Sequence, residues 1–308
     1  MSIKRLTLSS PIALRWTLLC MSLLIAYGVL ITSMTAPPPA LTSTTPIAQL
    51  TTHTKSSTTL AGAWTYDFSQ YPDGALSPND WQFEKGTKVA DYHNELQAYT
   101  DRTSNVRVEN GLLVIDAHRE QYEERQFTSA RITTANSFAF TYGTLEVDMM
   151  LPEGKGTWPA AWLMPRDSIY SPADYGIDKS NKHQWAVNGE IDFAEAIGRL
   201  PGQNIPAAHS YNSFSTAPVY TPAFIKNPYT QFHRYGIIKT ADKITFTLDG
   251  TPYATRTKNS DSPLDWPFNQ PYYLILNLAI GGNWAGQEGI DEASAPWQLK
   301  VRSISYTP

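Results

Sequence analysis

Residues 106–117 read VRVENGLLVIDA, and this stretch decides the fold class of the chain. Two runs with an apolar period of two flank the pair Asn110-Gly111. Asn-Gly is the dipeptide that two-residue β-hairpin turns favour, because both of its residues adopt a positive φ there. The stretch therefore predicts two antiparallel strands joined by a tight turn.

Three further segments have strand-like patterns. Residues 145–151 place Leu145, Val147, Met149 and Leu151 on one face of a strand, and residues 243–248 place three apolar side chains on one face before the turn pair Asp249-Gly250. Residues 272–280 are nearly all apolar, which suits a strand buried on both faces. The sequence has no long stretch of helical period and no internal repeat. Many strands with short turns predict an all-β fold, a single β-sandwich domain of about 245 residues.

The N-terminal segment differs in composition from the rest and predicts export. Residues 17–34 are uncharged and mostly apolar, near the minimum length of a membrane-spanning helix, and three basic side chains precede them. We interpret residues 1–36 as a signal peptide or a membrane anchor, the only part in contact with a membrane. Residues 37–62 are rich in Thr, Pro and Ser and predict a linker. The domain at 63–308 is then exported, and is periplasmic, extracellular or membrane-anchored.

Charge and cysteine content exclude several classes of function. Residues 1–60 carry four basic side chains and no acid, so the remaining 248 residues carry 20 basic and 28 acidic side chains, a net charge of −8. A mildly acidic domain repels phosphate, so we expect no nucleic-acid partner. The only cysteine is Cys20, so the domain can contain neither a disulfide nor a cysteine-ligated metal. Its stability must come from packing.

Residues 189–195 read GEIDFAE and place three acids on one predicted strand. In a regular strand Glu190 and Asp192 share a face, whereas Glu195 would point to the other side. A β-bulge at Phe193-Ala194 would return Glu195 to the acidic face, and bulges are over-represented beside active sites. We therefore predict that all three carboxylates line one groove.

Three converging carboxylates repel one another, so at least one should hold its proton near neutral pH, as a general acid beside an ionised nucleophile does. Glycosidic bond cleavage uses such a pair, about 5 Å apart when configuration is retained and about 6.5–9.5 Å apart when it is inverted. The spacing alone also fits a solvated strand edge or a calcium site. Other segments of the chain favour catalysis.

The chain resembles family 16 of the glycoside hydrolases, and within it the bulge-containing branch that includes the laminarinases, which are endo-β-1,3-glucanases. The resemblance extends over nearly all of residues 63–308. It implies a β-jelly-roll whose concave sheet forms an open sugar-binding cleft, and a retaining double-displacement mechanism. Seven segments in the family's order carry it: Asn94–Gln97, Ser129–Thr134, Tyr142-Gly143, Trp158–Pro165, Gly189–Glu195, Phe232–Tyr235 and Leu274–Trp284.

The resemblance assigns the three acids by their positions in the motif. Glu190 matches the nucleophile, Glu195 the acid/base and Asp192 the acid that holds a proton or tunes the nucleophile. This chemistry agrees with the physical interpretation above. The reaction requires no metal or organic cofactor. Many family members bind a structural calcium through an aspartate in the last strand. Leu299–Tyr306 contains no acid, so that calcium is left open.

The remaining matches predict the sugar-binding surface. Trp158 and Trp162 are four residues apart in a predicted strand and so face the same way. With Trp284 they match cleft aromatics that suit the faces of pyranose rings, although tryptophans in β proteins more often fill the core. Asn94 and Arg131 match polar residues that contact sugar hydroxyls, with structural hydrogen bonding as the alternative.

Two further features concern the same cleft. His209 lies where the strand after the catalytic one is expected, and a histidine there could support Glu195 or bind a sugar on the acceptor side. Residues 166–188 form a longer connection than is common in laminarinases. With Tyr170, Tyr175 and Trp185 this connection is expected to wall the cleft and to alter chain-length or linkage preference.

We predict a monomeric endo-hydrolase whose partner is a polysaccharide, a β-1,3-linked glucan. The alternatives are a hydrolase or transglycosylase acting on agarose, carrageenan or mixed-linkage glucan, and a non-catalytic glucan-recognition module. The acidic domain argues against a sulfated galactan, since such a chain favours basic clefts. The presence of all three carboxylates argues against a recognition module, which has no need of paired acids.

Overall fold

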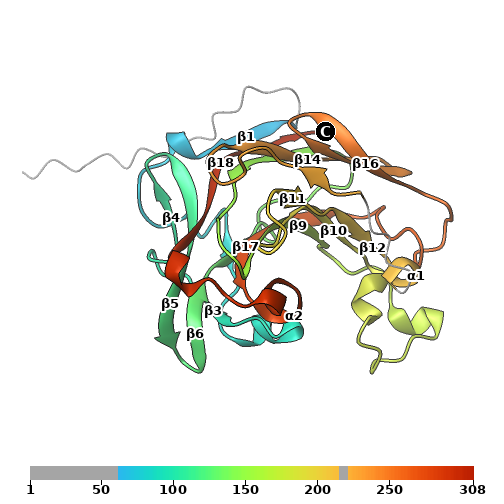
Figure 1. Cartoon of the computed structure of the whole chain (residues 1–308). Helices are drawn as coiled ribbons and strands as arrows, with labels where there is room; N and C mark the ends of the chain where they lie inside the picture. The colour runs from blue at the N-terminus through green and yellow to red at the C-terminus, as the bar shows by residue number, and fades with distance from the viewer. Residues whose placement is uncertain (1–61, 215–220) are drawn as a thin grey trace, which may run out of the picture. The chain divides into compact units, whose positions relative to one another are not determined.

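The computed structural model describes residues 62–214 and 221–308 (Figure 1). The predicted signal or anchor at 1–36 and nearly all of the predicted linker at 37–62 lie outside these ranges. Among the described residues, no helix combines the length and the apolar character that a membrane crossing needs.

Two large sheets make up most of the described domain (Figure 1). The larger has ten strands in the order β16 (Thr251–Thr257), β15 (Lys243–Leu248), β14 (His233–Lys239), β8 (Gly143–Met150), β18 (Trp297–Thr307), β5 (Leu112–Tyr122), β6 (Arg125–Ser129) and β3 (Gln97–Tyr99), with β1 (Trp64–Asp67) on β18 and β4 (Val106–Glu109) on β5. The smaller has six strands in the order β12 (Ala207–His209), β10 (Glu190–Glu195), β9 (Thr157–Pro165), β17 (Tyr272–Ile280), β7 (Arg131–Thr133) and β2 (Gln82–Phe83). Strands β11 (Gln203–Asn204) and β13 (Ala223–Phe224) form a separate pair.

Both predicted tight turns are present. Asn110 and Gly111 have φ values of 52° and 74° and join β4 to β5, so that Glu109 pairs with Leu112. Asp249 and Gly250 have φ values of 51° and 77° and join β15 to β16. Positive φ at both central residues is what lets a two-residue turn follow the twist of its strands.

The core lies between the two large sheets and follows the predicted alternation. Leu145, Val147 and Met149 of β8 are buried, and so are Ile244 and Phe246 of β15. The predicted strand at 272–280 is β17, in which every residue but one is buried. Apolar side chains from both sheets belong to one cluster, as a β-sandwich requires.

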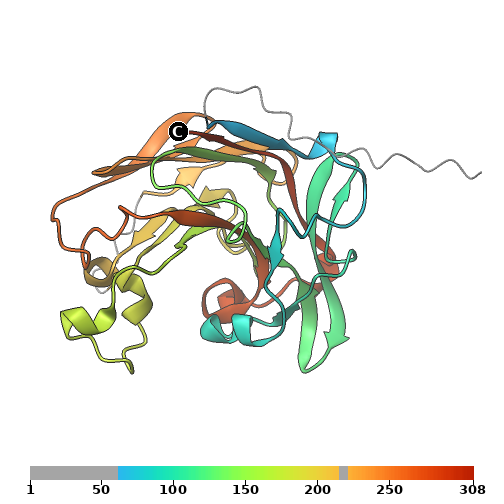
Figure 2. The same ribbon diagram turned by 180° about the vertical axis from the view of Figure 1, so that it is seen from behind.

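Helices are short and lie outside the sheets. The two α-helices of the described ranges, α1 (Tyr211–Phe214) and α2 (Gly282–Ala285), have four residues each. The 3-10 helices are η1 (Phe68–Gln70), η2 (Lys88–His93), η3 (Pro172–Tyr175), η4 (Gln184–Val187), η5 (Gly286–Glu288) and η6 (Glu292–Ser294). In Figure 2 η2 and α2 lie below one side of the six-stranded sheet, and residues 166–188 lie below the other side. These segments flank the exposed face of that sheet.

Candidate active site

Strand β10 carries the three predicted carboxylates between β9 and β12. Asp192 pairs with Trp162 of β9 and Ala194 pairs with Ala161, so one extra residue, Phe193, stands between them. Phe193 and Ala194 both lie in the core. This is the predicted β-bulge, and it is confirmed.

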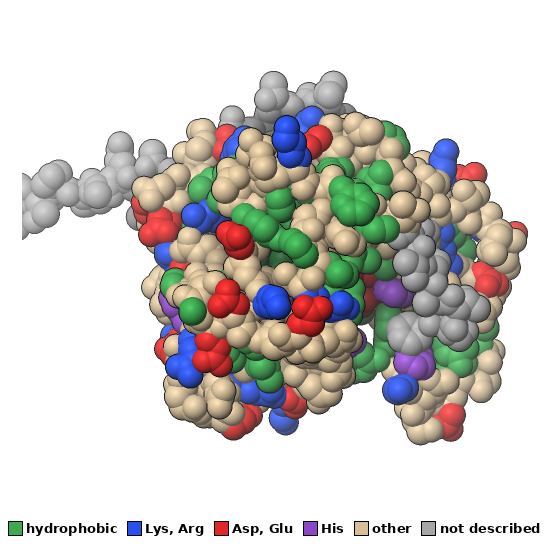
Figure 3. Space-filling model, viewed as in Figure 1, with side chains coloured by type: hydrophobic (Ala, Val, Ile, Leu, Met, Phe, Trp, Pro, Cys, Tyr) green, Lys and Arg blue, Asp and Glu red, His purple; other side chains and the backbone are tan. Residues whose placement is uncertain are grey.

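The bulge gathers the acids on the face of β10 opposite the core. Glu190, Asp192 and Glu195 all line one cavity of about 290 Å³ over the six-stranded sheet. Ala160 and Ala279 leave room in its floor, because their side chains are small. In Figure 3 a notch separates the lobe that carries residues 166–188 from the rest of the domain. The other lining residues are Val89, Tyr92, His93, Glu95, Arg131, Trp158, Trp162, Met164, Trp185 and Asn277.

The three carboxyl groups compete for ionisation. Burial raises the pKa of Glu190, Asp192 and Glu195, and the charge of Asp192 raises the pKa of the other two further. The Trp158 indole and His209 act in the opposite direction on the pKa of Glu195. Carboxylates this close cannot all be ionised, so the group retains at least one proton near neutral pH.

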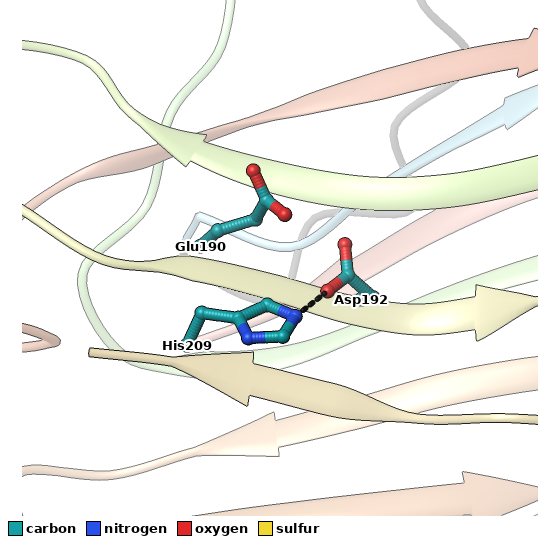
Figure 4. Close-up of side chains that lie close together, drawn as sticks. All are labelled: Glu190, Asp192 and His209. Atoms are coloured by element: carbon teal, nitrogen blue, oxygen red, sulfur yellow. Dashed lines mark ion pairs between the residues drawn. The ribbon is translucent and has the colours of Figure 1, made fainter. Parts of the chain in front are cut away.

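His209 of β12 lies beside Asp192 (Figure 4). The two strands pair so that His209 is opposite Glu190, and its Nε2 is 3.2 Å from Oδ2 of Asp192. His209 also lowers the pKa of Glu195 electrostatically. Both predicted roles, support of Glu195 and binding of a sugar on the acceptor side, stay predictions. His209 itself is outside the cavity lining.

One cluster in the described ranges could hold a metal ion. Ligand atoms of Glu190, Asp192 and His209 all lie within 4.8 Å of one another. An ion bound there would occupy the carboxylates that the predicted attack and proton transfer need, so a metal at this cluster and that chemistry are alternatives. The residues of β18 do not fit the calcium that the resemblance implies, since that strand has no carboxylate.

The two tryptophans of β9 face the cavity together, as their spacing predicts. The Trp158 Nε1 donates to Oε1 of Glu195 at 2.9 Å. The Trp162 Nε1 donates to Oδ1 of Asn277 at 2.8 Å, and the Arg131 guanidinium lies 4.6 Å from the Trp162 ring centre. Hydrogen bonds hold both indoles, so the orientation of both rings in the cavity is fixed.

Of three further predicted sugar ligands, one lines the cavity and two lie outside its lining. Arg131 lines the cavity and pairs with Glu84. Asn94 and Trp284 are outside the cavity lining: Asn94 donates to Asn283 at 3.0 Å, and the Trp284 ring packs edge-on against Trp158 at 5.3 Å. Sugar binding by these three residues, by His209 and by the two tryptophans of β9 stays a prediction.

Sequence reasoning left several cavity residues unassigned. Glu95 is only 8% exposed, accepts hydrogen bonds from Gln97 and Tyr99, and has its pKa raised by burial. Asn277 was recognisable as the polar interruption in an apolar strand. Trp185 lines the cavity as the longer connection predicted, whereas Tyr170 and Tyr175 are outside its lining.

Comparison with known proteins places this site in a family. The model for glycosyl hydrolases family 16 matches residues 93–298. The chain is 36% identical over 244 residues to a beta-glucanase of Rhodothermus marinus, covering 77% of this chain and 80% of that protein. The solved laminarinase of Rhodothermus marinus has a TM-score of 0.70 and 34% identity, covering 79% of this chain and 95% of the other.

A second solved structure is similar to the same extent. It is a mutant of SCLam, a non-specific endo-β-1,3(4)-glucanase from family 16 that was co-crystallised with 1,3-β-D-cellotriosyl-glucose. Its TM-score is 0.70 with 32% identity, and the match covers 80% of this chain and 93% of that one. This chain belongs to family 16 of the glycosyl hydrolases. The predicted family and the predicted β-sandwich fold are thereby confirmed, and the chain is a glycoside hydrolase.

Proposed function

We propose that this protein is a retaining endo-β-1,3-glucanase of the laminarinase type. The observation that carries the proposal is the bulge in β10, which brings Glu190, Asp192 and Glu195 into one cavity beside two held tryptophans. The relatives support the substrate, because their names are beta-glucanase, laminarinase and endo-β-1,3(4)-glucanase.

Each carboxyl group has a separate part in the proposed mechanism. Glu190 attacks the anomeric carbon and forms a covalent glycosyl-enzyme, while Glu195 gives its proton to the leaving glycosidic oxygen. Glu195 then takes a proton from water, which releases the sugar with its configuration retained. Asp192 holds a proton beside Glu190 and is itself oriented by His209. The two steps consume only the substrate and water, so we propose no cofactor.

Side chains of the cavity walls recognise the sugar units of the substrate. Trp158 and Trp162 present apolar ring faces, which suit the faces of pyranose rings, and Arg131 adds a cation. We further propose that the enzyme is exported and acts as a monomer, and the apolar stretch at 17–34 supports the export.

Release of reducing ends by the full-length protein tests the function. The substrates are laminarin, lichenan, agarose, carrageenan and xyloglucan, and the products are sized by chromatography. Short β-1,3-linked oligomers from laminarin are the expected result. Activity on a galactan alone would show that the proposed substrate is wrong and would leave the proposed mechanism unchanged. Binding without turnover would show that the protein is a recognition module.

The Glu190→Gln variant is the control for the mechanism. It keeps the size of the side chain and removes the nucleophilic oxygen anion, so turnover should fall by about four orders of magnitude or more while laminarin binding persists. Retention of wild-type turnover in this variant would reject Glu190 as the nucleophile.

A further inference from the structure

Two walls of the cavity are joined to each other by side chains. Tyr92, in η2, is 54% exposed, and its hydroxyl accepts a hydrogen bond from Nε1 of Trp185 at 3.0 Å. The same hydroxyl donates to the carbonyl oxygen of Lys182 at 3.2 Å. Trp185 and Lys182 belong to the segment 166–188, which lies across from η2 (Figure 2). Tyr92 and Trp185 therefore form a bridge between walls that belong to distant parts of the sequence.

Contacts run from the Tyr92 end of this bridge down to the catalytic acids. The Tyr92 ring meets the His93 ring edge-on at 4.7 Å, and the His93 ring lies 5.5 Å from that of Trp158. Trp158 in turn donates to Glu195. This wall is continuous from the bridge to the acid/base.

Contacts run down from the Trp185 end as well. The Trp185 ring lies 6.2 Å from the His209 ring in an edge-on arrangement, and His209 contacts Asp192. The side chains thus form a closed circuit around the cavity, with β10 in its floor, beside β9 and β17, and the bridge opposite. Because Tyr92 and Trp185 line the same cavity as the carboxylates, sugar units at the cleavage point must lie between the floor and the bridge.

We propose that the Tyr92–Trp185 bridge selects unbranched glucan chains. The inference rests on the proposed function and adds a determinant of specificity to it. A linear chain can lie under the bridge, whereas a glucosyl branch that points away from the floor at the cleavage point would occupy the position of the bridge. Both hydrogen bonds of the Tyr92 hydroxyl are exposed and compete with water, so the bridge can open to admit a chain from the side.

Two oligosaccharides test the proposal with the full-length protein. One is a linear β-1,3-glucohexaose, and the other has the same backbone with a β-1,6-linked glucosyl branch on an inner unit. The readout is the ratio of kcat/KM for the branched to that for the linear compound. In Tyr92→Phe this ratio should rise about 3- to 10-fold, the effect expected from losing one or two exposed hydrogen bonds. Tyr175→Phe makes the same change in the opposite wall outside the cavity lining and should leave the ratio at its wild-type value.

A second variant separates the bridge from a local effect of Tyr92. Trp185→Phe removes the donor of the same hydrogen bond and should raise the ratio as well. The double variant should raise it by less than the product of the two single effects, because both remove one shared interaction. A wild-type ratio in both single variants overturns the inference. Failure of the wild-type protein to cleave either compound would instead contradict the proposed function.

Discussion

At the scale of single residues, the two tryptophans of β9 differ in the group that accepts the hydrogen bond from the indole. Trp158 donates its indole proton to Glu195, whereas Trp162 donates to the neutral amide of Asn277. A donor to a carboxylate favours the ionised form, so Trp158 lowers the pKa of Glu195 against the effect of burial, which raises it. The indole therefore helps to set the pH above which Glu195 loses the proton it must give to the leaving group.

This contact predicts a shift in the pH profile. Glu195 must be protonated for the first step, so its pKa sets the alkaline limb of kcat/KM in the free enzyme. Trp158→Phe removes the donor and raises the pKa of Glu195, so the alkaline limb should move to higher pH by about one unit. Trp162→Phe is the matched control, because its partner carries no charge. Movement of the limb to lower pH in Trp158→Phe, or an equal shift in both variants, would contradict the assignment.

At the scale of the strand, the bulge in β10 orients the catalytic acid. Phe193 and Ala194 both point into the core, and this puts Glu195 back on the face of Glu190 and Asp192. The large apolar side chain of Phe193 is fully buried, so its burial helps to hold the extra residue in place. Stability and catalysis are therefore linked through one side chain that never touches the substrate.

Truncating that side chain should lower the stability of the domain. Phe193→Ala leaves a cavity in the core and should reduce the free energy of unfolding by about 3–5 kcal/mol, measured by urea denaturation. Phe224→Ala is the control, because Phe224 of β13 is 76% exposed and its removal should change stability by about 0.5 kcal/mol or less. Equal losses in the two variants would show that the bulge is not anchored by Phe193.

At the scale of the whole molecule, the described residues share one apolar core. One apolar cluster spans both large sheets, from Tyr66 to Ile304. The only cysteine, Cys20, lies outside the described residues. A single core of this size is sufficient for independent folding without covalent links.

A fragment of residues 62–308 should therefore be soluble and as active per molecule as the full chain. Its melting temperature should not change when a thiol reductant is added, since it contains no cysteine. Circular dichroism melting with and without reductant, together with specific activity on laminarin, measures both. An insoluble fragment, or one with little activity, would show that residues before 62 take part in the fold or the site.

Local patterns in the sequence determined the tight turns, the β-bulge and the family of this protein. Asn110-Gly111 and Asp249-Gly250 predict their turns because backbone preference depends on the residues themselves. The spacing of Glu190, Asp192 and Glu195 predicts a bulge, because side chains of a strand alternate with a period of two. The order of the motifs predicts the family. All of these signals involve residues within a few positions of one another or a recognised order along the chain.

Only the tertiary structure decided how distant segments meet at the cavity. The partner of His209 depends on the register of β12 against β10, and the burial of Glu95 depends on how its loop packs on the sheet. The bridge joins residues 93 positions apart, Tyr92 and Trp185, and neither carries a local signal for the other. Such contacts arise from the packing of whole segments against a shared core, so no short stretch of sequence contains them.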